Sequence, residues 1–213
     1  MNFDEFVTLV SKVKNITLPA EKSHLKMVPP YREDLIKQQA GNIANARKAA
    51  VMALFYPNSS NQTYLVLILR KTYKGVHSAQ IGFPGGKVEL EDKDLEYTAL
   101  RETFEEVGVP IDYITPLKAL TKVYIPPSNF YVSPFLGISK STPLFVKQDD
   151  EVEEILEVKL QDFLDDKNLK TKEVQLKDKS QFNVPAMELN NHLVWGATAM
   201  MLSEVKDLLK SVL

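Results

Sequence analysis

The sequence predicts a mixed α/β fold of the α+β kind, in which helices sandwich a mixed β-sheet. Apolar residues recur at helical spacing near both ends of the chain, over residues 3–13 and 194–209. A third helix is expected over residues 94–107, and short apolar runs of strand length fill much of the remaining sequence. The 213 residues are enough for one sizeable core and do not require two full domains.

The chain begins with an amphipathic helix and a proline-rich segment. The helix should begin near Asn2 or Asp4 and bury its apolar face of Phe3, Phe6, Val7, Val10 and Val13. Three prolines then predict an extended arm. We therefore divide the chain into residues 1–30, the N-terminal helix and arm, and residues 31–213, the main domain. The arm needs a partner surface, either on its own chain or on a second copy in a homodimer.

The middle of the chain predicts a hairpin, a loop and a helix. After a short helix at residues 32–39, the apolar runs 49–56 and 64–69 should pair, because a turn-rich segment separates them. A loop over residues 72–86 follows, and the helix of residues 94–107 should end at Gly108. The remaining expected elements are strands at 119–125, 131–138, 155–160, 172–176 and 181–187, a helical turn at 162–166 and the closing helix at 194–209.

Composition narrows the class of protein. The net charge of −2 gives no bulk attraction to nucleic acid or to an anionic membrane, and no apolar run approaches membrane-spanning length. Cysteine is absent, which excludes disulfides, thiolate catalysis and cysteine-based metal sites. The expectation is a cytoplasmic enzyme that binds a small molecule, with no nucleic-acid or membrane partner.

Three acidic residues share one face of the predicted helix 94–107. Glu102, Glu105 and Glu106 stand at spacings of three and four residues, where like charges oppose helix formation by about 0.2–0.5 kcal/mol per pair. A hard divalent cation bound by oxygen ligands explains such a cluster, and it favours Mg²⁺ or Mn²⁺ over zinc. The alternative is an acidic helix face that points to solvent.

A glycine-rich segment precedes this helix. In Phe83-Pro84-Gly85-Gly86-Lys87, paired glycines allow the backbone to approach a ligand closely, although an ordinary turn explains them equally well. The segment is not a Walker A loop, because Ile81 stands where its first glycine belongs and Val88 follows Lys87. The chain also lacks the nucleophile elbow Gly-x-Ser-x-Gly.

Together these residues resemble the Nudix box. That box reads Gly-x5-Glu-x7-Arg-Glu-U-x-Glu-Glu-x-Gly-U, where U is aliphatic, and the chain matches it at Gly86, Arg101, Glu102, Glu105, Glu106 and Gly108. The interval from Gly86 to Arg101 is one residue longer than in the box, and Asp92 stands nearest to its first Glu. Thr103 takes a position that is usually aliphatic. These departures leave the Arg-Glu-x-x-Glu-Glu-x-Gly core intact.

The residues before the box resemble the signature of coenzyme A diphosphatases, a subgroup of the Nudix hydrolase superfamily. That signature reads Leu-Leu-Thr-x-Arg-Ser/Ala-x3-Arg-x3-Gly-x3-Phe-Pro-Gly-Gly, and the chain keeps Arg70 and residues 83–86. It departs from the signature at Ile68, Lys71, Gly75 and Ala79. The missing cation at Gly75 weakens the inference that phosphate is recognised in the same way.

The resemblance implies a Nudix-like α/β/α sandwich with a mixed sheet and a loop-helix-loop catalytic motif. It implies metal-dependent hydrolysis of the diphosphate bond of coenzyme A or a derivative, which gives 3′,5′-ADP and a 4′-phosphopantetheine product. Glu102, Glu105 and Glu106 would hold the metal, and the resemblance adds the carbonyl of Gly86 as a further ligand.

Other residues are candidates for substrate binding and catalysis. Arg70, His77, Gly85 and Lys87 lie in or before the glycine-rich segment and are the candidates for binding a substrate that carries several phosphates. Arg101, beside Glu102, is expected to orient a carboxylate through a charge-assisted pair.

The general base is open between Glu105 and Glu151, the latter in a downstream acidic run. Two other functions also remain open. One is a Nudix pyrophosphatase that acts on a different nucleoside diphosphate derivative, such as ADP-ribose or a dinucleotide polyphosphate. The other is a ligand-binding module that has kept the fold and lost catalysis.

Overall fold

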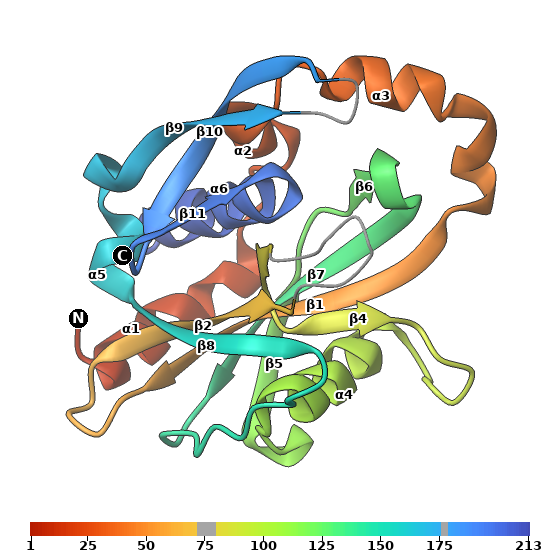
Figure 1. Cartoon of the computed structure of the whole chain (residues 1–213). Coiled ribbons are helices and arrows are strands. Elements are labelled where there is room, and N and C mark those ends of the chain that lie inside the picture. The colour runs from red at the N-terminus through yellow and green to blue at the C-terminus, as the bar shows by residue number, and fades with distance from the viewer. Residues whose placement is uncertain (72–79, 176–178) are drawn as a thin grey trace.

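The computed structural model describes residues 1–71, 80–175 and 179–213. Its larger sheet is mixed, and helices pack on both of its faces (Figure 1). The α+β fold with a mixed sheet is therefore confirmed. Among the residues described, no helix combines the length and the apolar character that crossing a bilayer requires.

The larger sheet is built around two parallel central strands. Its order is β3-β2-β1-β7-β5, with β4 also paired to β1, β6 to β7 and β8 to β2. Strands β1 and β7 are parallel, and the predicted hairpin is confirmed because Phe55 of β1 lies opposite Leu65 of β2. The strands are β1 (Arg47–Pro57), β2 (Thr63–Arg70), β3 (Ile81–Gly82), β4 (Gly85–Lys87), β5 (Ile114–Ala119), β6 (Val123–Ile125), β7 (Phe130–Ser139) and β8 (Val152–Lys159).

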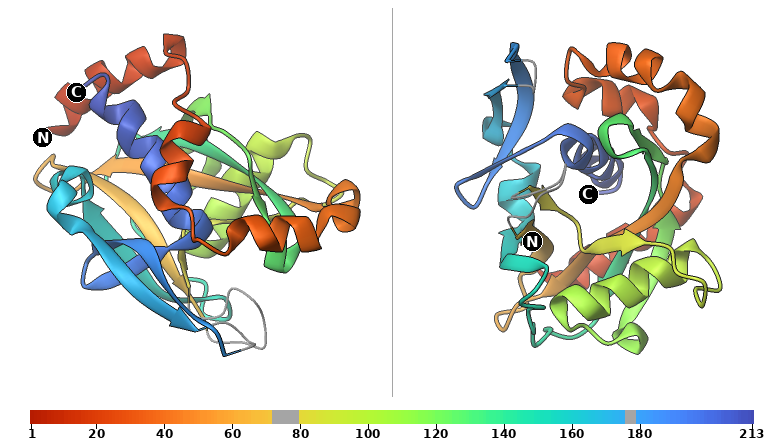
Figure 2. Two further views of the ribbon diagram at one scale, coloured as in Figure 1. Left: turned by 90° about the horizontal axis from the view of Figure 1, so that it is seen from above. Right: turned by 45° about the vertical axis from the view of Figure 1, so that its right-hand side comes forward.

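A second, antiparallel sheet lies beside the C-terminal helix in the order β11-β10-β9 (Figure 2). Its strands are β9 (Leu169–Gln175), β10 (Gln181–Leu189) and β11 (His192–Trp195). The α-helices are α1 (Phe3–Val10), α2 (Glu21–His24), α3 (Arg32–Gln38), α4 (Leu95–Val107), α5 (Leu160–Leu164) and α6 (Gly196–Lys210). Short 3-10 turns lie at Ser11–Asn15, Leu25–Met27, Ala40–Asn45, Ile111–Tyr113, Pro126–Ser128 and Asp166–Asn168.

Strand β1 separates two cores. Successive side chains of a strand point to opposite faces, so Met52 and Leu54 pack under α4 whereas Ala53 and Phe55 pack with α1 and α6. Figure 1 shows α4 on one side of the sheet and α1 and α6 on the other. This arrangement leaves α4 alone on its face, with the glycine-rich segment beside it.

The N-terminal helix is confirmed and packs on its own chain. Asn2 caps α1 by accepting the backbone N–H of Asp4 at 2.9 Å, and the rings of Phe6 and Phe55 lie 5.2 Å apart. The following segment is not the extended arm that the prolines predicted. It forms α2 and a 3-10 turn, because this coiled conformation lets Ser23 and His24 contact α6.

Several other predictions needed correction. The continuous strand predicted at 119–125 is confirmed only in part: Ala119 ends β5 and Val123–Ile125 form β6, but between them Thr121 donates its backbone N–H to the Glu204 carboxylate at 3.0 Å and joins no strand. Helix α6 begins two residues later than predicted, since Val194 and Trp195 pair with β10 as strand β11. The helical turn expected at 162–166 begins earlier, as α5.

The loop predicted over residues 72–86 contains strand β3 and the start of β4. Both strands are too short to show periodicity in the sequence.

Candidate active site

Helix α4 places Glu102, Glu105 and Glu106 at different depths. The predicted helix is confirmed, with Asp94 as N-cap and Gly108 at its end in the left-handed conformation, φ 76°. The side chain of Glu106 is 2% exposed, that of Glu102 12% and that of Glu105 48%. The helix therefore buries Glu106, partly buries Glu102 and leaves Glu105 near solvent.

Glu106 is buried with only part of its charge compensated. Its Oε2 accepts the backbone N–H of Gly85 at 2.7 Å, and its Oε1 lies 2.9 Å from Nη1 of Arg70. That second contact is an ion pair without a directed N–H, so Oε1 has no hydrogen-bond donor among the described residues. Burial raises the pKa of Glu106 to about 7, although Arg70 and the Gly85 amide oppose the shift.

Glu102 lies against the glycine-rich segment. Its Oε1 accepts a hydrogen bond from Nη1 of Arg101 at 3.1 Å. Burial raises its pKa to about 7 and outweighs the opposing effect of Arg101. A Cβ atom at Gly86 would overlap the Glu102 carboxylate, and one at Gly85 would overlap the backbone of β1. Gly85 is thus required for the close approach of β4 to β1, whereas a side chain at Gly86 would displace the Glu102 carboxylate.

Arg101 joins the glycine-rich segment, the following loop and the helix. Its Nε and Nη2 bind the two carboxylate oxygens of Asp92, each at 2.9 Å, and Nη2 also donates to the carbonyl of Lys87 at 3.1 Å. Its Nη1 donates to Glu105 at 2.9 Å as well as to Glu102. The Arg101 guanidinium holds the pKa of the buried Asp92 well below its usual range. Arg101 is therefore placed as a positioning residue for two carboxylates.

Asp92 was not among the predicted site residues. Its side chain is fully buried, and besides Arg101 it accepts from the hydroxyl of Thr98 at 2.8 Å and from the backbone N–H of Glu89 at 2.9 Å. The available signal was its position, the nearest acid to the first Glu of the box pattern. Sequence spacing does not show that this acid clamps Arg101.

Arg70 and Glu151 complete the cluster. Arg70 donates from Nη1 to the carbonyl of Gly85 at 3.3 Å, and its Nη2 lies 3.5 Å from the Glu151 carboxylate. Glu151 is 55% exposed and raises the pKa of both Glu102 and Glu106 through its negative charge. The structure thus gathers most of the predicted site residues at the junction of β2, β4, α4 and the start of β8.

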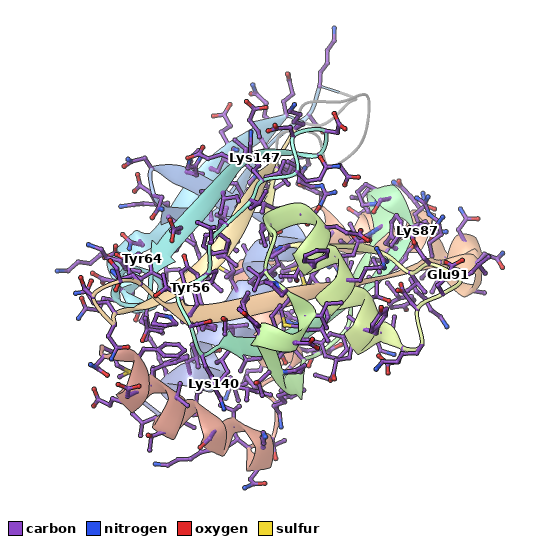
Figure 3. The ribbon with its side chains drawn as sticks, turned by 90° about the horizontal axis from the view of Figure 1, so that it is seen from below. Tyr56, Tyr64, Lys87, Glu91, Lys140 and Lys147 are labelled. Carbon is purple, nitrogen blue, oxygen red and sulfur yellow. The ribbon has the colours of Figure 1, made fainter. Side chains whose placement is uncertain are left out.

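Two further predicted residues are Lys87 and His77. The side chain of Lys87 is exposed, on the edge of the molecule away from Tyr56 and Tyr64 (Figure 3). Only its backbone carbonyl contacts Arg101. His77 lies outside the described residues.

The cluster fits a hard divalent cation, although its side chains are not arranged around one. Among the residues described, no three acidic or histidine side chains already converge as metal ligands, because Glu105 is turned to Arg101. The candidate ligands are all oxygens, Glu106 is buried and Glu102 partly buried, and Oε1 of Glu106 has no directed donor in the described ranges. These features suit Mg²⁺ or Mn²⁺ better than a soft metal.

The comparison with known families agrees with this site. A model of the NUDIX domain matches residues 46–178, more than half of the chain, and this stretch includes β4, α4 and Glu151. The chain belongs to the Nudix family. Its two departures from the Nudix box are accommodated: Asp92 reaches Arg101 across the longer interval, and the buried Thr103 donates its hydroxyl to the carbonyl of Ala99 at 2.6 Å.

Individual Nudix proteins share 30% or less of their sequence with this chain in the comparisons that follow. Nudix hydrolase 15, mitochondrial, of Arabidopsis thaliana is 27% identical over 162 residues, which are 72% of this chain and 55% of that protein. The chain thus spans about half the length of that relative. The uncharacterized Nudix hydrolase NudL of Yersinia pestis is 30% identical over 135 residues, 63% of this chain and 67% of NudL. The crystal structure of the Nudix hydrolase RenU from M. smegmatis shares the fold, with a TM-score of 0.53, 14% identity and coverage of 79% of this chain and 88% of RenU.

Proposed function

We propose that this Nudix chain is a metal-dependent hydrolase that cleaves the diphosphate bond of coenzyme A or a derivative. The products would be 3′,5′-ADP and a 4′-phosphopantetheine compound. The observation that carries the metal-dependent reaction is the pair of carboxylates formed by the buried Glu106 and the partly buried Glu102, whose pKa values are both raised to about 7 beside the paired glycines. Two adjacent acids that are largely withdrawn from solvent, with incomplete compensation, are suited to binding a cation.

The residues of the cluster have distinct tasks in this proposal. Glu102 and Glu106 hold Mg²⁺ or Mn²⁺, with Glu105 and the Gly86 carbonyl as further ligands. When bound, the cation neutralises charge on the phosphoryl oxygens and lowers the pKa of water. Arg101 keeps Glu102 in position through its own attachment to Asp92. Arg70 performs the same task for Glu106 and the Gly85 carbonyl.

Two carboxylates, Glu105 and Glu151, are the candidates for accepting a proton from the attacking water. Glu105 is half exposed and hydrogen-bonded to Arg101, whereas Glu151 is 55% exposed and ion-paired with Arg70. The matched variants Glu105→Gln and Glu151→Gln distinguish them. The variant that removes the true base should have a kcat about 100-fold or more below that of the wild type. Its pH–rate profile should also lack the acidic limb.

The preference for coenzyme A rests on residues 83–86 and on the longer interval before Arg101, both shared with the coenzyme A diphosphatase pattern. A second candidate is a pyrophosphatase for another nucleoside diphosphate derivative. The engagement of Arg70 with Glu106 and Glu151 favours this candidate, because the guanidinium is already paired with protein carboxylates. The departures at Lys71 and Ala79 favour it as well.

A substrate panel separates these candidates. Coenzyme A, ADP-ribose and diadenosine tetraphosphate would each be incubated with the protein and Mg²⁺ or Mn²⁺, and the products identified by chromatography. Hydrolysis of coenzyme A to 3′,5′-ADP is the expected result. Cleavage of ADP-ribose or the dinucleotide without cleavage of coenzyme A would establish the second candidate. Metal binding without any turnover would indicate a ligand-binding module.

A further inference from the structure

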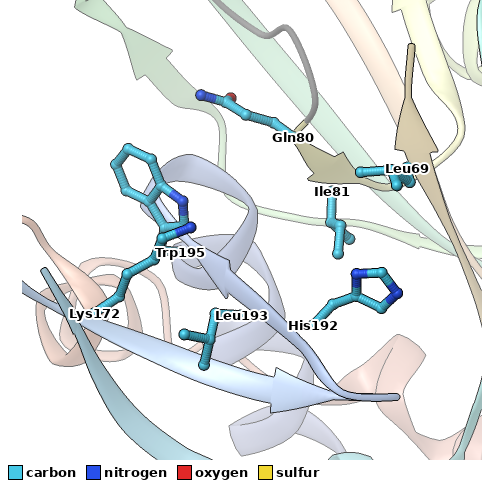
Figure 4. Close-up of a pocket in the computed structure, with 7 residues that line it drawn as sticks. All are labelled: Leu69, Gln80, Ile81, Lys172, His192, Leu193 and Trp195. Atoms are coloured by element: carbon cyan, nitrogen blue, oxygen red, sulfur yellow. The ribbon is translucent and has the colours of Figure 1, made fainter. Parts of the chain in front are cut away.

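A pocket of about 140 Å³ lies where the two sheets meet, behind the end of β2. Figure 4 shows Trp195 and Lys172 on one side of it and His192 on the other, with Gln80 above them. Leu69 and Ile81 contribute the aliphatic part of the wall. None of these residues belongs to the carboxylate cluster.

The pocket is nevertheless connected to the cluster through the end of β2. Leu69 lines the pocket, and the next residue, Arg70, points to the opposite face of the sheet and pairs with Glu106. The backbone N–H of Arg70 donates to the carbonyl of Gln80 at 3.0 Å. Ile81 precedes Gly85 by four residues, so even a fully extended chain separates them by at most about 14 Å. The two sites therefore lie within the reach of one extended ligand.

The side chains of the pocket suit a planar, polar and anionic group. Trp195 is half-buried, and Nζ of Lys172 lies 5.5 Å from the centroid of its ring. The amide of Gln80 and the imidazole of His192, which lies 3.5 Å from Glu154, complete the polar part of the wall. Aromatic rings stack on nucleobases, amides bind their ring edges, and a lysine ammonium binds phosphate.

We propose that this pocket binds the adenine nucleotide half of the substrate, with the purine against Trp195 and a phosphate facing Lys172. The identity of the nucleotide rests on the function proposed above. The flexible pantetheine half offers no flat face to the indole and is the competing occupant. The substrate then enters over the end of β2, with its diphosphate on the side of Glu106 and its base on the side of Trp195.

The chain has one tryptophan, so its fluorescence reports on this pocket alone. The full-length protein in EDTA would be titrated with 3′,5′-ADP and, separately, with 4′-phosphopantetheine, by fluorescence and by calorimetry. Only 3′,5′-ADP should change the emission of Trp195 in a saturable way. Lys172→Ala should weaken its binding about tenfold, as expected for the loss of one contact to a charged group.

Lys170→Ala is the matched control. Lys170 lies on the same strand, pairs with Glu188 at 3.6 Å and does not line the pocket, so its removal should leave binding unchanged. Circular dichroism melting verifies that both variants fold. Trp195→Phe, measured by calorimetry, should also bind 3′,5′-ADP more weakly than the wild type.

Three results would overturn the assignment. The first is a failure of the protein to bind 3′,5′-ADP. The second is binding of 3′,5′-ADP with no change in Trp195 emission and with the same affinity in Lys172→Ala as in the wild type. The third is a change of Trp195 emission with 4′-phosphopantetheine alone. Because the titration needs neither metal nor turnover, it is independent of the hydrolysis assay. Binding at Trp195 without coenzyme A hydrolysis would refute the proposed function and leave the nucleotide pocket standing. Coenzyme A hydrolysis with an unchanged KM in Lys172→Ala would refute the pocket alone.

Discussion

Glu106 and Glu204 are both buried, but their surroundings have opposite effects on their charge. Glu204, on α6, accepts the backbone N–H and the hydroxyl of Thr121 at 3.0 and 2.6 Å, the backbone N–H of Ala20 at 3.2 Å and a contact from His24 at 3.3 Å. Burial alone would raise its pKa, yet these hydrogen bonds outweigh burial and lower it. For Glu106, burial prevails and the pKa rises to about 7.

The comparison separates a structural acid from a functional one. Four contacts satisfy Glu204 and tie α2 and the segment after β5 to α6, so its charge stabilises the fold. Within the described part of the chain, Glu106 has one directed donor and a second oxygen without one, so its charge is only partly compensated. Burial of a carboxylate by itself therefore does not identify a candidate functional site. Burial of a carboxylate that lacks enough hydrogen-bond donors does identify one.

The largest effect is expected from Glu106→Gln. Replacing the charge should reduce kcat at least about 100-fold, because a metal-binding carboxylate is lost. The melting temperature of the metal-free protein should stay the same or rise, since a neutral amide can still accept the Gly85 N–H. Steady-state kinetics and circular dichroism measure the two effects. Wild-type turnover in this variant would remove Glu106 from the site.

Glu204→Gln should show the reverse behaviour. The amide group would face donors that now bind a carboxylate, which should cost about 2 kcal/mol and lower Tm by roughly 4–8 °C. The kcat at a temperature where the variant is folded should remain near the wild-type value, because Glu204 lies on the opposite side of the main sheet from α4. A stable variant with lost activity would contradict the division between the two acids.

Asp92→Asn tests how Arg101 is held. An asparagine cannot accept both N–H groups of the guanidinium, so Arg101 should lose its fixed position beside Glu102. We expect about tenfold weaker Mn²⁺ binding, in the range typical when a residue supporting a metal ligand is changed. Calorimetry measures the affinity, and Asp149→Asn, at an exposed acid, serves as the control. Unchanged affinity would show that the clamp does not support the site.

The smallest expected effect is on pH dependence. Glu102 and Glu106 lose their protons near pH 7 when folded and near the ordinary value of 4.5 when unfolded. The folded state binds more protons in this window, so the contribution of the two acids to stability is complete below 4.5 and is lost as pH rises through 7. A cation requires the ionised carboxylates, so Mg²⁺ should raise Tm more at pH 8 than at pH 6.

Comparing the wild type with Glu106→Gln isolates this effect from other titrating groups. The dependence of Tm on pH between 5 and 8 should be weaker in the variant. If Mg²⁺ raised the Tm of the wild type equally at pH 6 and pH 8, the raised pKa values of Glu102 and Glu106 would not control cation binding.

Local patterns predicted the parts of the fold that depend on local chemistry. Gly108 predicted the end of α4, and two short apolar runs separated by a turn-rich segment predicted the hairpin of β1 and β2. The acidic face of α4 was also predicted from spacing. Its unequal burial was not, because that depends on how closely Gly85 and Gly86 bring β4 to the helix.

Contacts between distant segments could not be predicted. The break at Thr121 depends on Glu204, which lies 83 residues further along the chain. Arg70 forms an ion pair with Glu106 and does not point to solvent. This position depends on the pairing of β2 with β3 and β8. Strand β11 was read as the start of a helix because apolar residues run on into α6, whereas Gly196, with φ 66°, separates the two.

Anomalous diffraction from crystals soaked in Mn²⁺ tests most directly whether the incompletely compensated acids form the metal site. An anomalous peak should lie between Glu102 and Glu106, next to the backbone of Gly86, and should be absent from crystals of Glu106→Gln. Saturating Mn²⁺ with no peak at this position, and with Glu106 still paired to Arg70, would contradict the assignment.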